Sequence, residues 1–129
     1  LGSLYHGTKF AVEGISESLH YEMAAIGVKV KIVEPGMIAT DFGGRSFDFQ
    51  AGDIADYQPI IEALMKQWQN PENTASPARL VAEVIYNAVT DGTDQLRYRA
   101  GDDANVLLDN RKKMSDSEFF EMINNQMGK

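Results

Sequence analysis

The sequence predicts an α/β protein with a parallel sheet, and three observations predict it. Apolar residues recur every four positions in the first segment, and the alternating run "VKVKIVEPG" follows it. Two more amphipathic segments separate that run from a second one, "QLRYRAG". Helices that stand between strands are typical of parallel α/β sheets. We therefore expect the order helix, strand, loop, helix, helix, strand, helices.

The first half of the chain carries clear boundary signals. A helix is expected from Tyr5 to Ile26, because Gly27 can adopt the left-handed conformation that ends helices. The strand Val28–Val33 should stop at Pro35-Gly36, and a glycine- and phenylalanine-rich loop follows. An amphipathic helix is then expected from Asp53 to Gln69.

The second half is predicted in the same way. Ser76 should cap a helix that has Pro77 in its first turn and ends at Gly92. Residues 102–114 should form the next helix. Ser115 and Glu118 have the spacing of a capping box for the last helix.

The composition of the chain argues against several kinds of partner and binding site. The 129 residues are 43% apolar and 24% charged, as in ordinary globular domains, with a net charge of −7. An acidic chain repels phosphate backbones and anionic lipids, so we expect neither nucleic acid nor a membrane as partner. The absence of cysteine excludes disulfides and thiolate metal sites and fits a cytoplasmic location. The two histidines lack nearby carboxylates at ligand spacing, so no metal site is expected.

Only two strands are predicted, and this number has a consequence for domain organisation. A parallel sheet is covered on both faces, and two strands alone do not make an independently stable sheet. The apolar strand Val28–Val33 therefore needs neighbours that this sequence does not supply. We expect residues 1–129 to be the C-terminal portion of a larger α/β domain whose front half is absent.

The short stretch "SLYHGTKFAVEG" contains the residues best suited to chemistry. Tyr5 and Lys9 lie four apart and should share one face of the first helix. An ammonium group near a phenol favours the phenolate, which makes tyrosine useful as an acid–base for an alcohol or carbonyl. By itself the pair is weak evidence, because most such pairs are an aromatic ring packed on an aliphatic stem.

The wider segment from Tyr5 to Phe42 resembles the short-chain dehydrogenase/reductase family. That family has Tyr-x-x-x-Lys at the start of a long helix, then a strand that ends in Pro-Gly, with a threonine shortly after. Here those positions are Tyr5, Lys9, Pro35, Gly36 and Thr40. The later segments "SPARLVAEVIYNAVTDG" and "LRYRAGDDA" are also similar to the family's C-terminal end.

The resemblance implies a fold and a set of roles. The fold would be the C-terminal portion of a Rossmann-type doubly wound parallel sheet, with about two strands and flanking helices. Tyr5 would be the catalytic acid–base, and Lys9 would bind the nicotinamide ribose and tune Tyr5. The segment after Pro35-Gly36 would hold the nicotinamide carboxamide, through the backbone of Ile38 and the hydroxyl of Thr40.

The implied activity is reversible hydride transfer between NAD or NADP and an alcohol or ketone. NADP is slightly preferred, although no residue here decides between the two, since the residue that meets the adenosine ribose lies in the front half. The first helix resembles the family's principal dimer helix, so a homodimer or homotetramer is expected.

Parts of the family pattern are not in this sequence. No glycine-rich phosphate loop follows a strand, and the catalytic serine and the Asn-Ala-Gly segment are missing. The chain alone should therefore be inactive. The alternative function is a non-catalytic fold remnant that binds a partner protein through its exposed sheet edge and long helix.

The aromatic residues after Thr40 allow two interpretations. They could line a pocket for an apolar or bulky substrate, or they could fill a core as aromatic residues of amphipathic helices usually do. These residues are Phe42, Phe47, Phe49, Tyr57 and Trp68.

Overall fold

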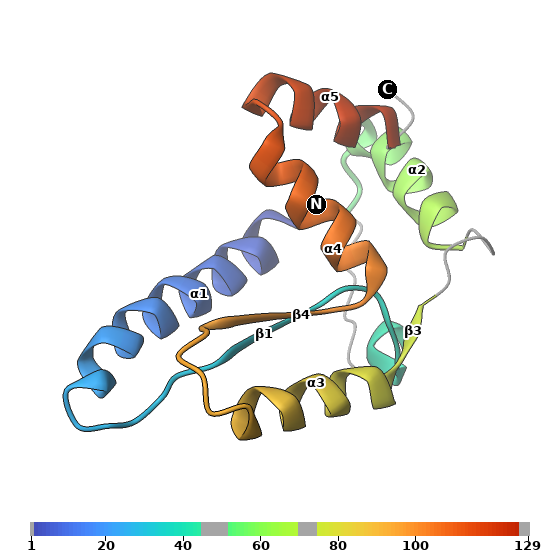
Figure 1. The fold of residues 1–129 in the computed structure, drawn as a ribbon. Coiled ribbons are helices and arrows are strands. Elements are labelled where there is room, and N and C mark those ends of the chain that lie inside the picture. Colours follow the sequence, from blue (N-terminus) through green and yellow to red (C-terminus); the bar gives the residue numbers. More distant parts are fainter. Residues whose placement is uncertain (1, 45–51, 70–74, 127–129) are drawn as a thin grey trace.

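The structure is a computed structural model that describes residues 2–44, 52–69 and 75–126. The two longest strands are separated by helices, as predicted (Figure 1). The elements are α1 Ser3–Ala24, β1 Ile32–Pro35, β2 Ile38–Ala39, η1 Asp41–Gly43, η2 Ala55–Tyr57, α2 Gln58–Trp68, β3 Ser76–Pro77, α3 Ala78–Thr90, β4 Arg97–Ala100, α4 Asp102–Lys113 and α5 Asp116–Gln126.

The centre of the fold is a parallel pair of strands, β1 and β4. Ile32 pairs with Arg97 and Pro35 with Ala100, so both strands end at the same edge. Helix α1 lies along one face of the pair and α3 along the other (Figure 1). This arrangement confirms the predicted α/β class with a parallel sheet.

The buried core is small and sits mostly between the strand pair and α3. Tyr98 is 5% exposed and Ala88 of α3 is 1% exposed. The other buried apolar residues of the described chain are Ile32, Ile61, Ala100 and Ala104. No residue of α1 is buried, and most of its apolar side chains are exposed within the described residues.

Helix α1 ends as its sequence predicts. Gly27 has a φ of 74°, and the N–H groups of Gly27 and Val28 donate to the carbonyls of Ala24 and Met23 at 3.1 and 3.0 Å. These two bonds form a Schellman motif, which satisfies carbonyls that the helix leaves unpaired. The predicted helix boundaries, Tyr5 and Ile26, each differ from the observed ones by two residues.

Ion pairs attach α1 to the strand pair. The Nε of Arg97 lies 3.1 Å from Glu13, and its Nη2 lies 2.5 Å from Glu17. Arg97 belongs to β4, whereas both glutamates belong to α1, one turn apart. This cluster therefore sets the position of α1 over the sheet.

Three predicted boundaries were wrong. The strand expected at Val28–Val33 begins only at Ile32, because the ladder with β4 begins where the Ile32 N–H donates to Leu96 at 2.7 Å. Ser76 does not cap α3: it belongs to β3, and Pro77 takes the N-cap position. The helix expected from Asp53 starts later, with the single turn η2 before α2.

The sequence analysis also missed a second strand pair. β2 and β3 form a parallel two-stranded sheet in which Ile38 pairs with Ser76 and Ala39 with Pro77. The capping box is confirmed: the Ser115 N–H donates to Glu118 at 2.8 Å, and the Glu118 N–H donates back to the Ser115 hydroxyl at 3.4 Å.

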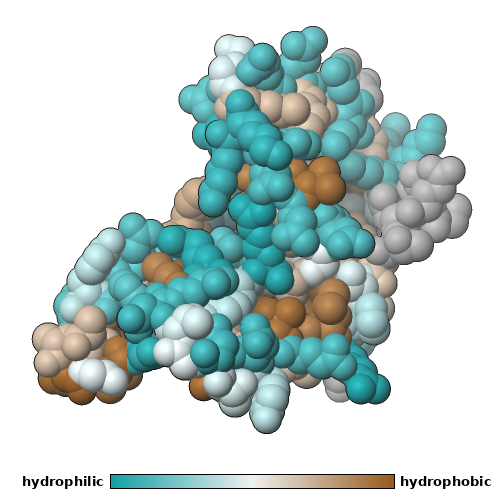
Figure 2. Space-filling model, viewed as in Figure 1, coloured by the Kyte–Doolittle hydropathy of each residue, from teal (hydrophilic) through white to brown (hydrophobic). Residues whose placement is uncertain are grey.

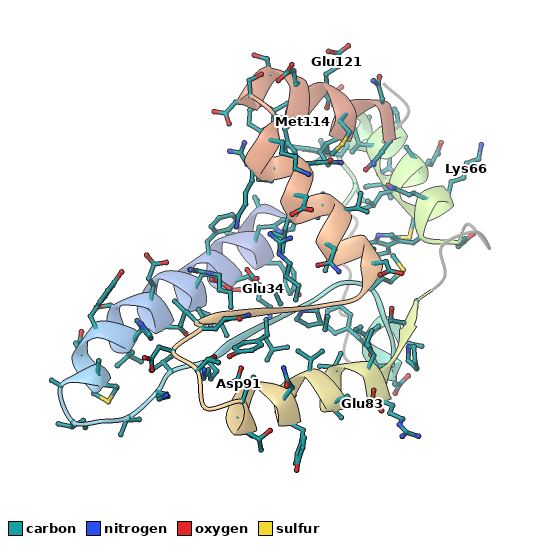
Figure 3. The ribbon with its side chains drawn as sticks, viewed as in Figure 1. Glu34, Lys66, Glu83, Asp91, Met114 and Glu121 are labelled. Atoms are coloured by element: carbon teal, nitrogen blue, oxygen red, sulfur yellow. The ribbon has the colours of Figure 1, made fainter. Side chains whose placement is uncertain are left out.

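A polar network closes the turn between α3 and β4, where Figure 3 labels Asp91. The Tyr98 hydroxyl donates to Asp91 Oδ2 at 2.6 Å, and the Thr93 N–H donates to Asp91 Oδ1 at 2.9 Å. The Lys31 Nζ lies 3.7 Å from the same carboxylate. The Tyr98 bond is the largest of the interactions that lower the pKa of Asp91 to about 2.

We expect this network to make the free energy of unfolding depend on pH in the acidic range. The pKa of folded Asp91 lies below its ordinary value of 3.8, so the charged carboxylate stabilises the fold above about pH 4. That contribution is lost as the pH falls through about 2. In thermal unfolding at pH 5, the melting temperature of Asp91→Asn should be lower than that of the unchanged chain. At pH 2 the two melting temperatures should be closer together. Asp102→Asn, an exposed control, should show no such convergence, and a constant gap for Asp91→Asn would contradict the assignment.

Candidate active site

Tyr5 and Lys9 lie near the start of α1, one turn apart. The Lys9 Nζ is 5.6 Å from the centroid of the Tyr5 ring, and Tyr5 is 50% exposed. The Thr8 hydroxyl donates to the Tyr5 carbonyl oxygen at 2.7 Å. The structure therefore brings the ammonium and the phenol together on one helix face and leaves the phenol accessible to a ligand.

The Pro35-Gly36 turn lies where β1 and β4 both end. The Gly36 N–H donates to the Ala100 carbonyl at 2.9 Å, which ties the turn to the last residue of β4. In open parallel sheets, ligands bind outside the carboxyl ends of the strands. The predicted carboxamide-holding segment thus occupies the edge of the sheet where a ligand is expected.

Beyond this turn, the chain passes into β2 and then into η1. The Ser76 N–H donates to the Met37 carbonyl at 2.9 Å. Successive peptide groups of a strand point to opposite sides, so the N–H and carbonyl of Ile38 point away from β3. Thr40 is exposed at the N-cap of η1, and its hydroxyl accepts from the Phe42 N–H at 3.4 Å.

An aromatic contact brings the helix and the loop together. The rings of Tyr5 and Phe42 have centroids 6.3 Å apart and planes inclined by 54°. Phe42 lies two residues after Thr40, so the Tyr5 ring lies next to the residue that closely follows the predicted nicotinamide segment. Among the described residues, no hydrogen bond, ion pair or ring contact joins Lys9 to residues 35–40.

Comparison with known proteins decides the family. A family model described as short chain dehydrogenase matches residues 1–67. The chain belongs to the short-chain dehydrogenase family. The matched region contains every residue that the sequence analysis assigned to the site, from Tyr5 to Thr40.

Individual members of the family agree with this assignment. The chain is 44% identical to an uncharacterised oxidoreductase of Schizosaccharomyces pombe over 128 residues, which are 99% of this chain and 53% of that protein. It is 30% identical to dehydrogenase/reductase SDR family member 9 of Bos taurus over 82% of this chain and 37% of that protein. It is 49% identical to mitochondrial D-beta-hydroxybutyrate dehydrogenase of Bos taurus over 78% of this chain and 33% of that protein. The chain spans about half the length of the S. pombe relative.

The structure adds one residue to this short-chain dehydrogenase site that sequence reasoning missed. The Met37 N–H donates to Asp103 Oδ2 at 2.5 Å, so the first turn of α4 contacts the loop after Pro35-Gly36. The sequence held one weak signal for this residue: Asp103 lies two residues after Gly101, at the point where a strand is followed by a helix. Nothing in the pattern says which backbone group such a carboxylate contacts.

The structure describes three of the five aromatic residues that could line a pocket or fill a core. Phe42, Tyr57 and Trp68 are 52%, 46% and 46% exposed, so none of the three fills a core in the described residues. Phe47 and Phe49 lie outside the described residues.

In the part of the chain that the structure describes, no helix has both the length and the apolar character needed to span a membrane.

Proposed function

We propose that this chain supplies the acid–base and the nicotinamide-holding loop of an NAD(P)-dependent oxidoreductase. The reaction is reversible hydride transfer between a nicotinamide cofactor and an alcohol or ketone. One observation carries the proposal: the Tyr5 ring, paired with Lys9, lies beside Phe42 in the loop that follows Pro35-Gly36.

The loop has groups that suit a nicotinamide carboxamide. A carboxamide offers two donors and an acceptor. The backbone N–H and carbonyl of Ile38 point away from β3, and the hydroxyl of exposed Thr40 can donate or accept. We assign Ile38 and Thr40 to the carboxamide, while Pro35 and Gly36 form the turn that orients them.

Each residue of the pair then has a defined task. The bound cofactor supplies or accepts the hydride. The Tyr5 hydroxyl gives a proton to the substrate oxygen during reduction, or takes it during oxidation. The Lys9 ammonium holds the ribose and lies beside the Tyr5 ring. Orientation of the cofactor against the substrate carbon is the protein's main contribution to the rate.

The rest of the activity needs groups that this sequence does not contain. A glycine-rich turn at a helix N-terminus normally binds the pyrophosphate. We propose that residues 1–129 act as the C-terminal portion of a Rossmann-type domain and are inactive alone. Either NAD or NADP suits the residues present.

The test joins this chain to the part of the S. pombe oxidoreductase that it does not span, which we call the completed enzyme. Isothermal titration with NADH and NADPH should show micromolar binding of one of them to the completed enzyme. The chain alone should bind neither tightly, because it lacks the pyrophosphate turn. A folded completed enzyme that binds neither nucleotide would contradict the proposal, and tight binding by the chain alone would contradict the need for a second part.

A second candidate function is an interaction module, and the outer surface of α1 favours it. Leu4, Phe10 and Tyr21 are 88%, 77% and 71% exposed. Figure 2 shows a further apolar patch at the left, where α1 ends and the chain turns toward β1; Ile26 is 70% exposed there. The same surface suits the dimer or tetramer that we propose for the enzyme. The nucleotide titration separates the two functions, because a module has no reason to bind NADH or NADPH.

A further inference from the structure

The peptide groups of Met37 are held from two sides. Its N–H donates to Asp103 Oδ2 at 2.5 Å, and its carbonyl accepts from the Ser76 N–H at 2.9 Å. Asp103 belongs to the first turn of α4, and Ser76 belongs to β3. Two elements far along the chain therefore fix the one residue that stands between Gly36 and Ile38.

Asp103 is directed at this loop instead of at its own helix. A carboxylate in the first turn of a helix commonly bonds to a free N–H of that helix. Here α4 has Gly101 at its N-cap and no side-chain cap, and the Asp103 carboxylate instead reaches across to Met37. A bond between a charged carboxylate and a backbone N–H is shorter and stronger than one between neutral groups.

Two glycines make room for the carboxylate. A Cβ at Gly36 would overlap the carboxylate of Asp103. A Cβ at Gly101 would lie 2.6 Å from Asp103 Oδ1, and Gly101 has a φ of 111°, which side chains rarely allow. The placement of the Asp103 carboxylate against the Met37 N–H thus depends on glycine at both positions.

We propose that Asp103 is a positioning residue for the nicotinamide end of the cofactor, acting through the Met37 peptide. This role rests on the proposed function, since it requires the Ile38 backbone and Thr40 to hold the carboxamide. Asp103 fixes the Gly36–Met37 peptide, one peptide before the one that contains the Ile38 N–H, so its loss lets the carboxamide-binding groups shift. A misplacement of about 1 Å in such a site can lower a rate by roughly 10²-fold.

The experiment separates the two ends of the cofactor. The completed enzyme is titrated with its preferred nicotinamide nucleotide and with ADP-ribose, or the 2′-phosphate of ADP-ribose for an NADP enzyme. ADP-ribose lacks the nicotinamide. Asp103→Ala should weaken nucleotide binding about tenfold while the affinity for ADP-ribose changes less than about twofold. Asp103→Asn keeps an acceptor oxygen and should recover part of the loss.

A matched control lies next in the sequence. Asp102 occupies the same helical turn, is exposed, and makes no hydrogen bond or ion pair within the described residues. Asp102→Ala removes the same charge and should leave the ratio of the two affinities unchanged. Equal weakening of both ligands by Asp103→Ala, or equal ratios for the Asp102 and Asp103 variants, would overturn the proposed role.

A second measurement keeps the proposal testable if Asp103→Ala does not fold. In the completed enzyme, amide hydrogen exchange of Met37 should be faster in Asp103→Asn than in Asp102→Asn, because an amide acceptor is weaker than a carboxylate. Equal exchange rates would overturn the role of Asp103. Absence of nucleotide binding by the unmutated completed enzyme is a separate outcome that overturns the proposed function and, with it, this inference.

Discussion

Tyr5→Phe should lower the turnover of the completed enzyme by roughly 10²-fold or more and leave cofactor affinity nearly unchanged. Phenylalanine keeps the ring, and with it the contact with Phe42 at 6.3 Å. It removes only the hydroxyl that, in the proposed function, exchanges a proton with the substrate oxygen. The measurements are steady-state rates with alcohol and ketone substrates and titration with the cofactor.

Tyr86→Phe is the matched control for this change. Tyr86 lies on α3 and is 71% exposed, and the substitution removes the same kind of hydroxyl. Its rate should equal that of the unchanged enzyme. If Tyr5→Phe retained a rate within a few-fold of that value, Tyr5 would not be the acid–base.

Lys9→Ala should reduce both cofactor affinity and turnover, the affinity by about tenfold. The change removes the proposed ribose contact and also the positive charge 5.6 Å from the centroid of the Tyr5 ring. Titration with the cofactor and steady-state rates of the completed enzyme measure the two effects.

Lys9→Arg separates the charge of the side chain from its shape, because it keeps the charge and changes the shape. Its cofactor affinity and turnover should stay closer to those of the unchanged enzyme than the values for Lys9→Ala do. Lys66→Ala, a change near the end of α2, controls for the loss of one surface charge. Equal affinity and turnover for the arginine and alanine variants would count against a role for the Lys9 charge.

The parts of the fold that depend on neighbours in sequence were predictable. Gly27 ended α1, and Ser115 and Glu118 formed the expected capping box, because each needs only a few adjacent residues. The pairing of β2 with β3 was not predictable: each strand has two residues, too few to show any periodicity. The late start of β1 at Ile32 was set by its distant partner strand.

The same distinction applies to the site. Tyr5 and Lys9 were found because four-residue spacing places side chains on one face of a helix. Asp103 was not found, because its partner is a backbone N–H at Met37, and backbone groups carry no sequence identity. Phe42 could be named as an aromatic residue of the loop, but only the tertiary fold places its ring beside Tyr5.

The parallel pairing of β1 with β4 has a consequence for the order of events during synthesis. Ile32 cannot pair with its partner until Arg97, about 65 residues later, has been synthesised. At ribosomal speeds of 5–20 residues per second, the wait is roughly 3–13 s. Throughout that interval, the edge of β1 that β4 later covers has open N–H and carbonyl groups that another strand could pair with. A nascent chain that stalls before β4 therefore exposes an edge prone to aggregation, although the Tyr5–Lys9 helix is already made.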